Sequence, residues 1–556
     1  MPVDDLGPTP GRQVARPEHA PREGADSSSA RATLTRGGTR LRLPPAAIGP
    51  GIGWALFALA CQNPTPPLPP PDTVGLTIGV PQSRQFDPGH GVSNVADAFT
   101  YERLTSSDAT GRTVARLLES WSVQADGLTW NLRLRPGIKF QDGTPLAAAD
   151  VKRSIELARA RPGGMASSVC WPDVWAIDTP SNLDVVVRLR RRCFYLLDDL
   201  DPAITRGPPD QKPVGTGPYV VVSSSADEYL LRANQQYYLG PPAVGNVVVR
   251  SYDTLRTAWV DMMRGRVDFL WEVGPDTAEF LRDQASVAVR SFPSYYSYSI
   301  ALNSARPPFR DPVVRRALSI AVDRAELIQL GLKGMGLPAN DPVWPSYWAR
   351  ASQVADIPYD PARAAGMLPA RPGVASTAAG DRSAFPAARI EFTCLVPANF
   401  TIYERLALLV QRQLRAIDVE MRIESLPSNQ FLIRVQSGDF DAVLLNMVGG
   451  PYAMIQYRFW HSPGARRMWN VWDYRNATVD AALEAMRDAP DDGAFRAAMA
   501  RFTSAVHDDP PAIFLAWSDT VQAVSRRFEL PAIAKGRDAL YSLNRWRPRG
   551  AGDRFP

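Results

Sequence analysis

The residues best suited to contacting a ligand gather in one short segment, Asn446 to Tyr452, with the sequence NMVGGPY. It directly follows four apolar residues, AVLL, which are typical of a buried strand. The adjacent Gly449 and Gly450 would let the backbone approach a ligand closely, while Asn446 and Tyr452 can form hydrogen bonds with it. An ordinary turn has the same composition, so the segment alone leaves both interpretations open.

Aromatic residues accompany this segment and indicate the walls of a cleft. The set comprises Tyr295, Tyr296, Tyr298, Trp460, Trp469 and Trp472. Such walls suit peptides, sugars and metal chelates alike, and any one of these side chains is more often part of a core. His461 would be a metal ligand or a base only with a second His or a carboxylate at ligand spacing, which the neighbouring sequence does not supply.

Catalytic and metal-binding patterns do not occur in the sequence. The chain has four cysteines and four histidines without a CxxC pair, which gives a zinc site no basis. It contains neither G-x-S-x-G nor H-E-x-x-H. The run GTGP at 215–218 lacks the lysine of a phosphate loop, and we interpret it as a tight turn before a strand. We therefore expect a binding protein without a cofactor, and not an enzyme.

The cysteines leave one question open. Cys170 and Cys193 could form a disulfide in an oxidising compartment, or they could be two buried thiols. Cys394 lies in an apolar strand pattern and is expected in the core. The run Arg188 to Arg192 holds four arginines in five residues, and we interpret it as a solvated strand and its turn.

Length and charge bound the class of protein. At 556 residues, 45% of them hydrophobic, the chain is long enough for one two-lobed body or several cores. The 62 basic and 57 acidic side chains leave a net charge of +5, which is small for this length. Without a strongly basic face, nucleic acid is not an expected partner.

The N-terminal part predicts export. Residues 1–43 are rich in Pro, Gly, Ser, Arg and Ala and are expected to be disordered. Arginines then precede an uncharged apolar run, 46–60, which is shorter than the about 17 to 25 residues of a spanning helix. Small residues lead up to Cys61, so residues 44–61 resemble a bacterial lipoprotein signal in which Cys61 becomes the lipidated N-terminus. A signal this far from Met1 suggests a later start codon. Residues 62–73 would be a stiff proline-rich linker.

The C-terminal half predicts alternating strands and helices. Strands are expected at 389–395, 419–423 and 442–445, with helices at 406–417 and 431–435 between them. This β-α-β-α-β order predicts a parallel sheet with right-handed crossovers. Ligands of such sheets bind beyond the carboxyl ends of the strands, which here are Val396 to Asn399 and Asn446 to Tyr452.

A different stretch, Tyr101 to Arg159, identifies a family. Trp130 to Leu134 alternates as a half-buried strand, Pro136-Gly137 turns the chain, Ile138 to Phe140 returns, and a helix begins near Pro145. The informative runs are YExL from Tyr101, LxSW from Leu118, DGLTW from Asp126, LRPGxKFxDGTPL from Leu134, DV at Asp150, and FRDxxVRRALSIAVDR from Phe309. Together they resemble the signature of the extracytoplasmic solute-binding proteins of ABC importers, family 5, the type that binds peptides and nickel.

The resemblance implies an α/β, two-lobed periplasmic-binding-protein fold, class II-like, with an extra inserted small domain and a hinge between the lobes. Lobe I would comprise residues 74–95, 202–297 and 517–550, the inserted small domain 96–201, and lobe II 298–516. Within the block, Ala147 stands where the family has a threonine that caps the helix.

The function implied is capture of a solute, with a peptide-like compound favoured over an opine, glycoside or metal chelate, and its delivery to the permease of an ABC importer. The expected ligand contacts are Tyr101, Tyr295, Tyr298, Asn399, Asn446, Gly449, Gly450, Tyr452 and Trp460. The protein is expected to be a monomer in the periplasm or on the outer face of the cytoplasmic membrane. A sensor with the same fold, or a hydrolase that uses the cleft, is the alternative.

One departure from the family bears on the ligand. Peptide-binding members carry an aspartate in the segment 446–452 that pairs with the ligand's free amino group, whereas this chain has Gly450 at about that place. An unpaired buried ammonium is costly. The resemblance therefore implies that another carboxylate serves, or that the ligand has no free α-amine.

Overall fold

The computed structural model describes residues 75–81, 91–160, 168–199, 202–208, 212–351, 356–369, 389–398, 400–450, 452–462, 469–531 and 538–549. All of them belong to one compact unit, residues 69–556, which is separate from residues 1–68. The predictions for residues 1–43, the signal at 44–61 with Cys61, the linker at 62–73, and Asn399 lie outside the described residues.

The largest element is an eleven-stranded sheet with the strand order β15-β14-β16-β12-β17-β11-β1-β10-β9-β8, in which β13 also pairs with β17. Its strands are β1 (Gly75–Pro81), β8 (Tyr219–Ser224), β9 (Glu228–Ala233), β10 (Asn246–Tyr252), β11 (Phe269–Leu270), β12 (Val287–Leu302), β13 (Gly336–Pro338), β14 (Ile390–Pro397), β15 (Val419–Leu426), β16 (Ala442–Val448) and β17 (Ala512–Ser525). The short strands β2 (Thr105–Ser107), β3 (Thr113–Ala115), β18 (Phe528–Glu529) and β19 (Arg547–Pro548) form two separate antiparallel pairs, β2 with β3 and β18 with β19.

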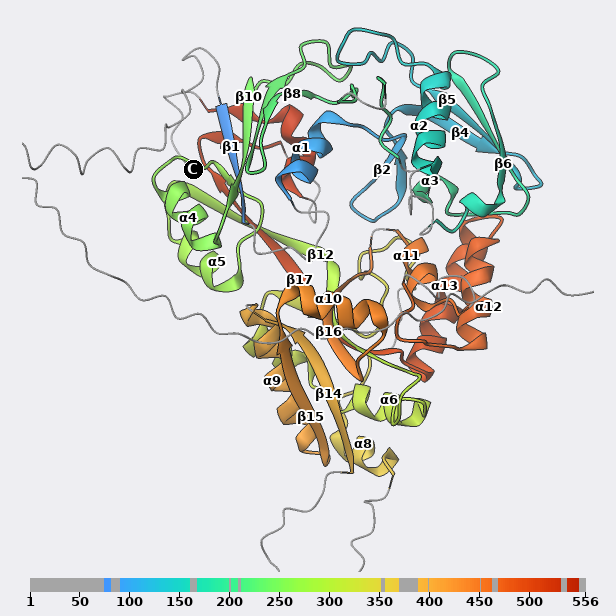
Figure 1. The fold of residues 1–556 in the computed structure, drawn as a ribbon, viewed down its shortest axis with the longest axis vertical. Coiled ribbons are helices and arrows are strands. Elements are labelled where there is room, and N and C mark those ends of the chain that lie inside the picture. The colour runs from blue at the N-terminus through green and yellow to red at the C-terminus, as the bar shows by residue number, and fades with distance from the viewer. Residues whose placement is uncertain are drawn as a thin grey trace, which may run out of the picture. The chain divides into compact units, whose positions relative to one another are not determined.

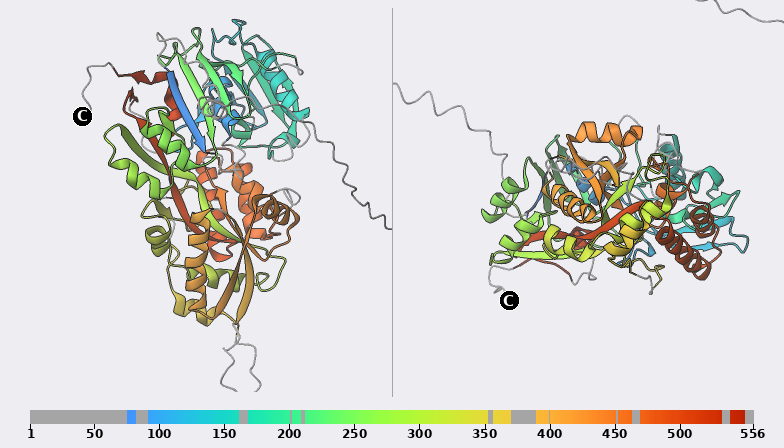
Figure 2. Two further views of the ribbon diagram at one scale, coloured as in Figure 1. Left: turned by 60° about the vertical axis from the view of Figure 1, so that its left-hand side comes forward. Right: turned by 90° about the horizontal axis from the view of Figure 1, so that it is seen from below.

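Two long strands of this sheet, β12 and β17, connect its two ends (Figure 1), and Figure 2 shows them from two further sides. They pair antiparallel from Val287 to Ala301, with a register shift between Pro293 and Ser297. The predicted lobe boundaries, at residues 297 and 517, fall on Ser297 and Trp517, which are register partners. The division into lobes stays a prediction. A hinge at these boundaries would bend β12 and β17 at residues that lie opposite each other.

The expected β-α-β-α-β unit is present. β14 pairs parallel with β15 and with β16, and α9 (Thr401–Arg415) and α10 (Ser428–Ser437) connect them. Leu406, Val410 and Leu414 of α9 are fully buried at helical spacing, so this face packs on the sheet. α10 is longer than predicted and ends at Gly438, whose φ of 71° closes the helix in the left-handed region.

The stretch that identified the family contributes β4 and β5 to a smaller sheet with the order β4-β5-β7-β6. Its strands are β4 (Leu118–Val123), β5 (Thr129–Leu134), β6 (Val174–Asp178) and β7 (Asp184–Leu189). We call these strands, with α2 (Ala148–Ala160) and α3 (Leu196–Asp199), the small sheet unit.

Two predictions for this stretch were wrong in detail. The returning segment Ile138 to Phe140 is not a strand, because only an isolated bridge between Lys139 and Pro145 forms there. The helix begins at Ala148 and not near Pro145, which that bridge occupies. The missing threonine at Ala147 is offset by Asp150, whose carboxylate accepts a hydrogen bond from the Ala147 N–H at 3.0 Å.

The remaining helices cover the two sheets. They are α1 (Val92–Thr100), α4 (Leu255–Met263), α5 (Pro275–Arg282), α6 (Pro312–Ile320), α7 (Arg324–Glu326), α8 (Pro361–Met367), α11 (Met454–Trp460), α12 (Ala477–Arg487) and α13 (Asp492–Asp508). Within the described part of the chain, no helix is both long and apolar enough to cross a membrane.

The structure shows the bonding state of three cysteines. Cys170 and Cys193 form a disulfide, which ties the segment before β6 to the segment after β7. Cys394 is a buried free thiol in β14, as expected for a core position.

Candidate functional site

The exit of β16 brings several of the predicted ligand contacts together. Asn446 pairs in register with Tyr298 of β12, and Val448 pairs with Tyr296. Beyond the strand, the Gly449 and Gly450 N–H groups both donate to the Tyr295 carbonyl, at 2.8 and 3.2 Å. The segment is therefore held against β12 by backbone hydrogen bonds that continue the sheet.

The two glycines are required here by packing. A Cβ on Gly449 would lie 2.2 Å from Trp517 Cη2 and 2.5 Å from the Pro342 carbonyl oxygen. A Cβ on Gly450 would lie 2.7 Å from the Cβ of Trp344. The sequence pattern leaves both a ligand contact and an ordinary turn open at these glycines; in the structure, Trp517 and Trp344 fill the space beside them.

Trp344 belongs to a turn that sequence analysis did not single out, residues 341–350. Asp341 at its start is fully buried and accepts two hydrogen bonds from the Arg350 guanidinium at its end, both at 2.7 Å. Inside the turn, Trp344 packs edge-on against Tyr295, with ring centroids 5.0 Å apart. We call this segment the braced turn, because the ion pair closes it at its base.

Asn446 carries an unsatisfied acceptor. Its Oδ1 is buried and accepts no hydrogen bond from the residues that the structure describes. A buried polar atom without a partner costs about 1–3 kcal/mol. A hydrogen-bond donor on a solute, or a water, would satisfy this oxygen. Asn446 is therefore the strongest of the predicted ligand contacts.

Tyr298 and Trp460 have core positions. Tyr298 is buried and packs edge-on against Tyr403 of α9 at 5.2 Å. Trp460 has no exposed surface, and its indole N–H donates to the Gln456 side chain at 3.0 Å. The expectation that both touch a solute stays a prediction, and in this arrangement each side chain packs in the core.

The other predicted ligand contacts lie in different parts of the structure. Tyr101 donates its hydroxyl hydrogen bond to the Pro213 carbonyl at 3.2 Å, and burial, followed by the nearby Asp97, raises its pKa to about 12. Tyr452 is partly buried against the main hydrophobic cluster. The GTGP run is a turn before β8, as predicted, and its glycines approach the Thr100 backbone too closely for a Cβ.

The small sheet unit is bound to α11, α12 and α13 by charged and apolar contacts. Arg191 donates to Asp488, at 2.6 and 3.0 Å, and also to Glu484. The Phe194 N–H donates to the Arg487 carbonyl at 2.7 Å. The sequence predicts a solvated arginine run, whereas Arg191 joins elements about 290 residues apart in the chain.

Glu484 is the centre of these contacts. Besides Arg191, its carboxylate accepts the Tyr457 hydroxyl at 2.7 Å and lies 2.8 Å from His461 Nε2. The hydrogen bond from His461 is the largest cause that lowers the pKa of Glu484 to about 2, and Tyr457 and Arg191 add to it against the opposing effect of burial.

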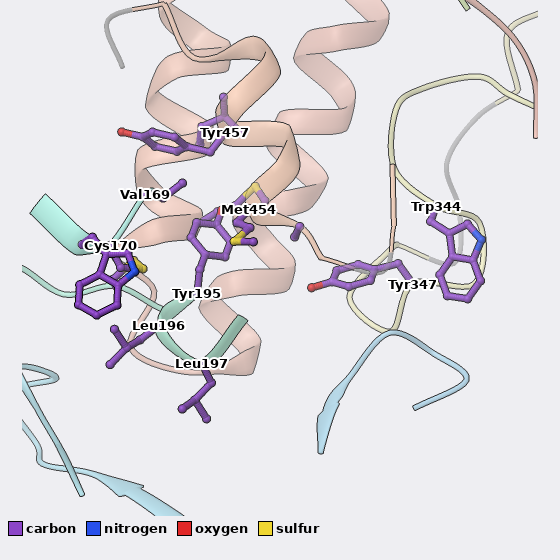
Figure 3. Close-up of a cluster of buried hydrophobic side chains, with 14 of the residues drawn as sticks. Val169, Cys170, Tyr195, Leu196, Leu197, Trp344, Tyr347, Met454 and Tyr457 are labelled. Carbon is purple, nitrogen blue, oxygen red and sulfur yellow. A yellow bond between two sulfur atoms is a disulfide. The ribbon is translucent and has the colours of Figure 1, made fainter. Parts of the chain in front are cut away.

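Apolar side chains complete the same contact (Figure 3). Tyr195, Leu196 and Leu197 of the small sheet unit lie near Met454 and Tyr457 of α11, beside the disulfide of Cys170. These residues belong to one hydrophobic cluster that continues through both regions. The contact was not predictable from spacing, since its two sides are remote in sequence.

The sequence pattern of one family matches residues 112–466, and it is described as bacterial extracellular solute-binding proteins, family 5 Middle. The chain belongs to this family. Its members are extracytoplasmic solute-binding proteins, and the expected fold class is confirmed.

Individual relatives agree with this assignment. The oligopeptide-binding protein AppA of Bacillus subtilis is 24% identical over 473 residues, covering 80% of this chain and 86% of AppA. The glutathione-binding protein GsiB of Escherichia coli is 28% identical over 287 residues, which are 49% of this chain and 56% of GsiB. The crystal structure of NikZ from Campylobacter jejuni in complex with Ni(L-His) has a TM-score of 0.71 at 21% identity, and the match covers 85% of this chain and 99% of NikZ.

Proposed function

We propose that this chain is an exported receptor that captures a peptide-like solute between its two lobes and delivers it to the membrane permease of an ABC importer. The observation that carries the proposal is the family match, which spans residues 112–466 of 556. The names of AppA and GsiB, an oligopeptide-binding and a glutathione-binding protein, favour a peptide-like solute.

The chemistry of the β16 exit narrows the solute. Gly450 offers no carboxylate, and Trp344 fills the space that a side chain there would need. Asn446 offers a buried acceptor that would take an N–H donor. We therefore propose a solute that presents an amide or similar N–H to Asn446 and no free α-ammonium to residue 450.

Capture would require the lobes to separate and close again. The contacts of Arg191 with Glu484 and Asp488 would form on closing and break on opening, while β12 and β17 stay paired. Since Arg191 is 41% exposed, each ion pair would contribute at most about 1 kcal/mol. Contacts this weak would allow reversible opening.

The proposal can be tested by a thermal-shift screen of the purified protein over peptides, opines, glycosides and metal chelates, together with mass spectrometry of co-purified compounds. A true solute at a hundredfold excess over its Kd should stabilise the protein by about 2.7 kcal/mol. The variant Asn446→Leu should lose most of this stabilisation. Conversion of the best ligand into a product would refute the receptor function.

We also propose that Cys61 anchors the protein to a membrane through a lipid. The variant Cys61→Ser should then move the protein from the membrane fraction to the soluble fraction when cells are fractionated. Unchanged membrane retention of this variant would contradict lipidation at this position.

A further inference from the structure

The start of β1 and the segment that follows β17 lie at the same end of the large sheet. Asp268, directly before β11, accepts a hydrogen bond from the Thr77 N–H of β1 at 3.0 Å. The same carboxylate accepts one from Arg527, two residues after the end of β17, at 3.1 Å. Figures 1 and 2 accordingly show the red C-terminal segment beside β1.

Two aromatic rings hold this C-terminal segment on the sheet. Its strands β18 and β19 pair antiparallel. Phe528 of β18 and Trp546, directly before β19, are buried, and Trp546 packs edge-on against Phe269 of β11 at 5.8 Å. The residues on either side of the two rings are exposed, and these are Arg527, Glu529, Arg545 and Arg547.

The segment is strongly basic. Residues 525–531 and 538–549, the part of it that the structure describes, contain five arginines against two acids, Glu529 and Asp538, which is a formal charge of +3. The net charge of all 556 residues is only +5, so this excess is local. The five side chains, which we call the arginine surface, are Arg526, Arg527, Arg545, Arg547 and Arg549.

The exposed arginines are largely without acidic partners. Arg547 lies opposite Glu529 in the strand pair, but neither Arg547 nor Arg545 forms an ion pair with a residue that the structure describes. Arg527 is paired with Asp268, yet its side chain stays 57% exposed. A basic surface that its own acids do not neutralise attracts an anionic partner.

The anchor proposed at Cys61 would bring a membrane close to this surface. Fourteen residues separate Cys61 from Gly75 at the start of β1, so a fully extended connection spans at most about 50 Å. Charges on a surface attract one another within about 8–10 Å at physiological salt. A tether returns the surface to this distance repeatedly, so a weak attraction is enough to hold it there.

We propose that the arginine surface binds the anionic lipid headgroups of the membrane that carries the anchor. Clusters of about four to eight basic side chains beside a membrane anchor bind anionic lipids. Because the connection from Cys61 ends at the start of β1, the membrane is the anionic surface that these arginines meet first. The inference rests on the proposed anchoring and adds to it which end of the large sheet faces the membrane.

Co-sedimentation of the purified chain 62–556 with lipid vesicles tests the proposal. This chain has neither Cys61 nor the apolar run before it, and it keeps the compact unit, residues 69–556. It should bind vesicles of phosphatidylcholine mixed with phosphatidylglycerol, but not vesicles of phosphatidylcholine alone. Binding should be lost in about 1 M salt, where the Debye length is about 3 Å. Absence of binding to the mixed vesicles, or equal binding to both kinds, would overturn the proposal.

The double variant Arg545→Gln, Arg547→Gln identifies the surface and leaves both buried rings in place. Its binding to the mixed vesicles should be weaker by about fivefold for each arginine, the fold-change that corresponds to about 1 kcal/mol for a basic side chain near an anionic surface. An affinity equal to that of the unmodified chain would place the lipid contact elsewhere and contradict the inference.

The matched control is Arg363→Gln with Arg501→Gln. Both arginines are exposed and form no ion pair with a described residue, and their helices, α8 and α13, are well separated from β1 in Figure 1. The control has the same net charge as the double variant and should bind like the unmodified chain. Equal weakening of the two variants would mean that net charge alone determines binding, and the arginine surface would have no special role.

The anchor and the arginine surface can fail separately. Fractionation of Cys61→Ser reports on the lipid anchor, whereas the vesicle assay uses a chain without Cys61. Retention of Cys61→Ser in the membrane fraction together with vesicle binding that depends on Arg545 and Arg547 would reject the anchor and support the arginine surface. Release of Cys61→Ser without any vesicle binding of chain 62–556 would support the anchor and reject the arginine surface.

Discussion

The packing of Gly449 gives the sharpest prediction for stability. Replacing it with alanine places a Cβ 2.2 Å from Trp517, which is about 1.2 Å short of the 3.4 Å at which ordinary contact begins. Trp517 is 1% exposed, so its ring cannot move away without displacing its neighbours or entering solvent. The ring, the backbone, or both must shift.

The magnitude follows from two contributions. Overpacking of a buried site costs about 1–3 kcal/mol. The same Cβ lies 2.5 Å from the Pro342 carbonyl, which accepts a hydrogen bond from Gln456 at 2.8 Å, and loss of that bond adds about 1 kcal/mol. We expect Gly449→Ala to lower the free energy of unfolding by about 2–4 kcal/mol.

The matched control is Gly366→Ala in α8, where a Cβ would meet no atom within 4 Å. Alanine there should stabilise the protein by about 0.5–1 kcal/mol, because glycine loses more conformational entropy in a helix. Equilibrium urea unfolding, followed by tryptophan fluorescence, compares the two variants. If Gly449→Ala is as stable as the wild type, the glycine does not serve the packing of Trp517, and the assignment of this segment to packing is wrong.

Three further predictions concern the contact between the small sheet unit and the helices. Replacing Cys170 and Cys193 by serine should cost about 3 kcal/mol, because the disulfide closes a loop of 23 residues in the unfolded chain; reductant should then lower the Tm of the wild type but not of the variant. The pKa of Glu484, lowered to about 2 chiefly by His461, means that its contribution to stability is complete above about pH 4.5 and is lost as the pH falls toward 2. Between pH 5 and pH 3, the free energy of unfolding of Glu484→Gln should accordingly fall less than that of the wild type. Identical pH profiles of the two proteins would contradict this role. Arg191→Gln should cost at most about 1 kcal/mol and increase the radius of gyration in small-angle scattering if the contact holds the lobes together; an unchanged radius would mean that apolar packing alone holds them.

Much of the fold could be predicted from the sequence. The β-α-β-α-β unit was predictable because Leu406, Val410 and Leu414 repeat at helical spacing, and because residues 442–445 of β16 form a continuous apolar run. The strand Trp130 to Leu134 was equally clear from its alternation. The start of α2 was misplaced because proline is common in the first turn of a helix, whereas Pro145 here pairs with Lys139.

The candidate site was less predictable, because its walls come from distant parts of the chain. Nothing near Gly449 in sequence reveals that Trp517 and Trp344 occupy the space beside it. The same holds for Arg191, whose partners follow almost 300 residues later. Local pattern fixes which residues form an element, but only tertiary packing decides whether a glycine faces a ligand or a tryptophan.

The braced turn has a consequence for regulation. Trp344 packs against Tyr295 at the proposed solute site, and the buried pair of Asp341 and Arg350 holds it in one short unit with Trp348. A solute that shifts Trp344 would therefore move Trp348 with it. By thermodynamic reciprocity, any compound that binds against Trp348 and shifts the same unit would change the Kd of the solute by the same factor by which the solute changes the Kd of that compound.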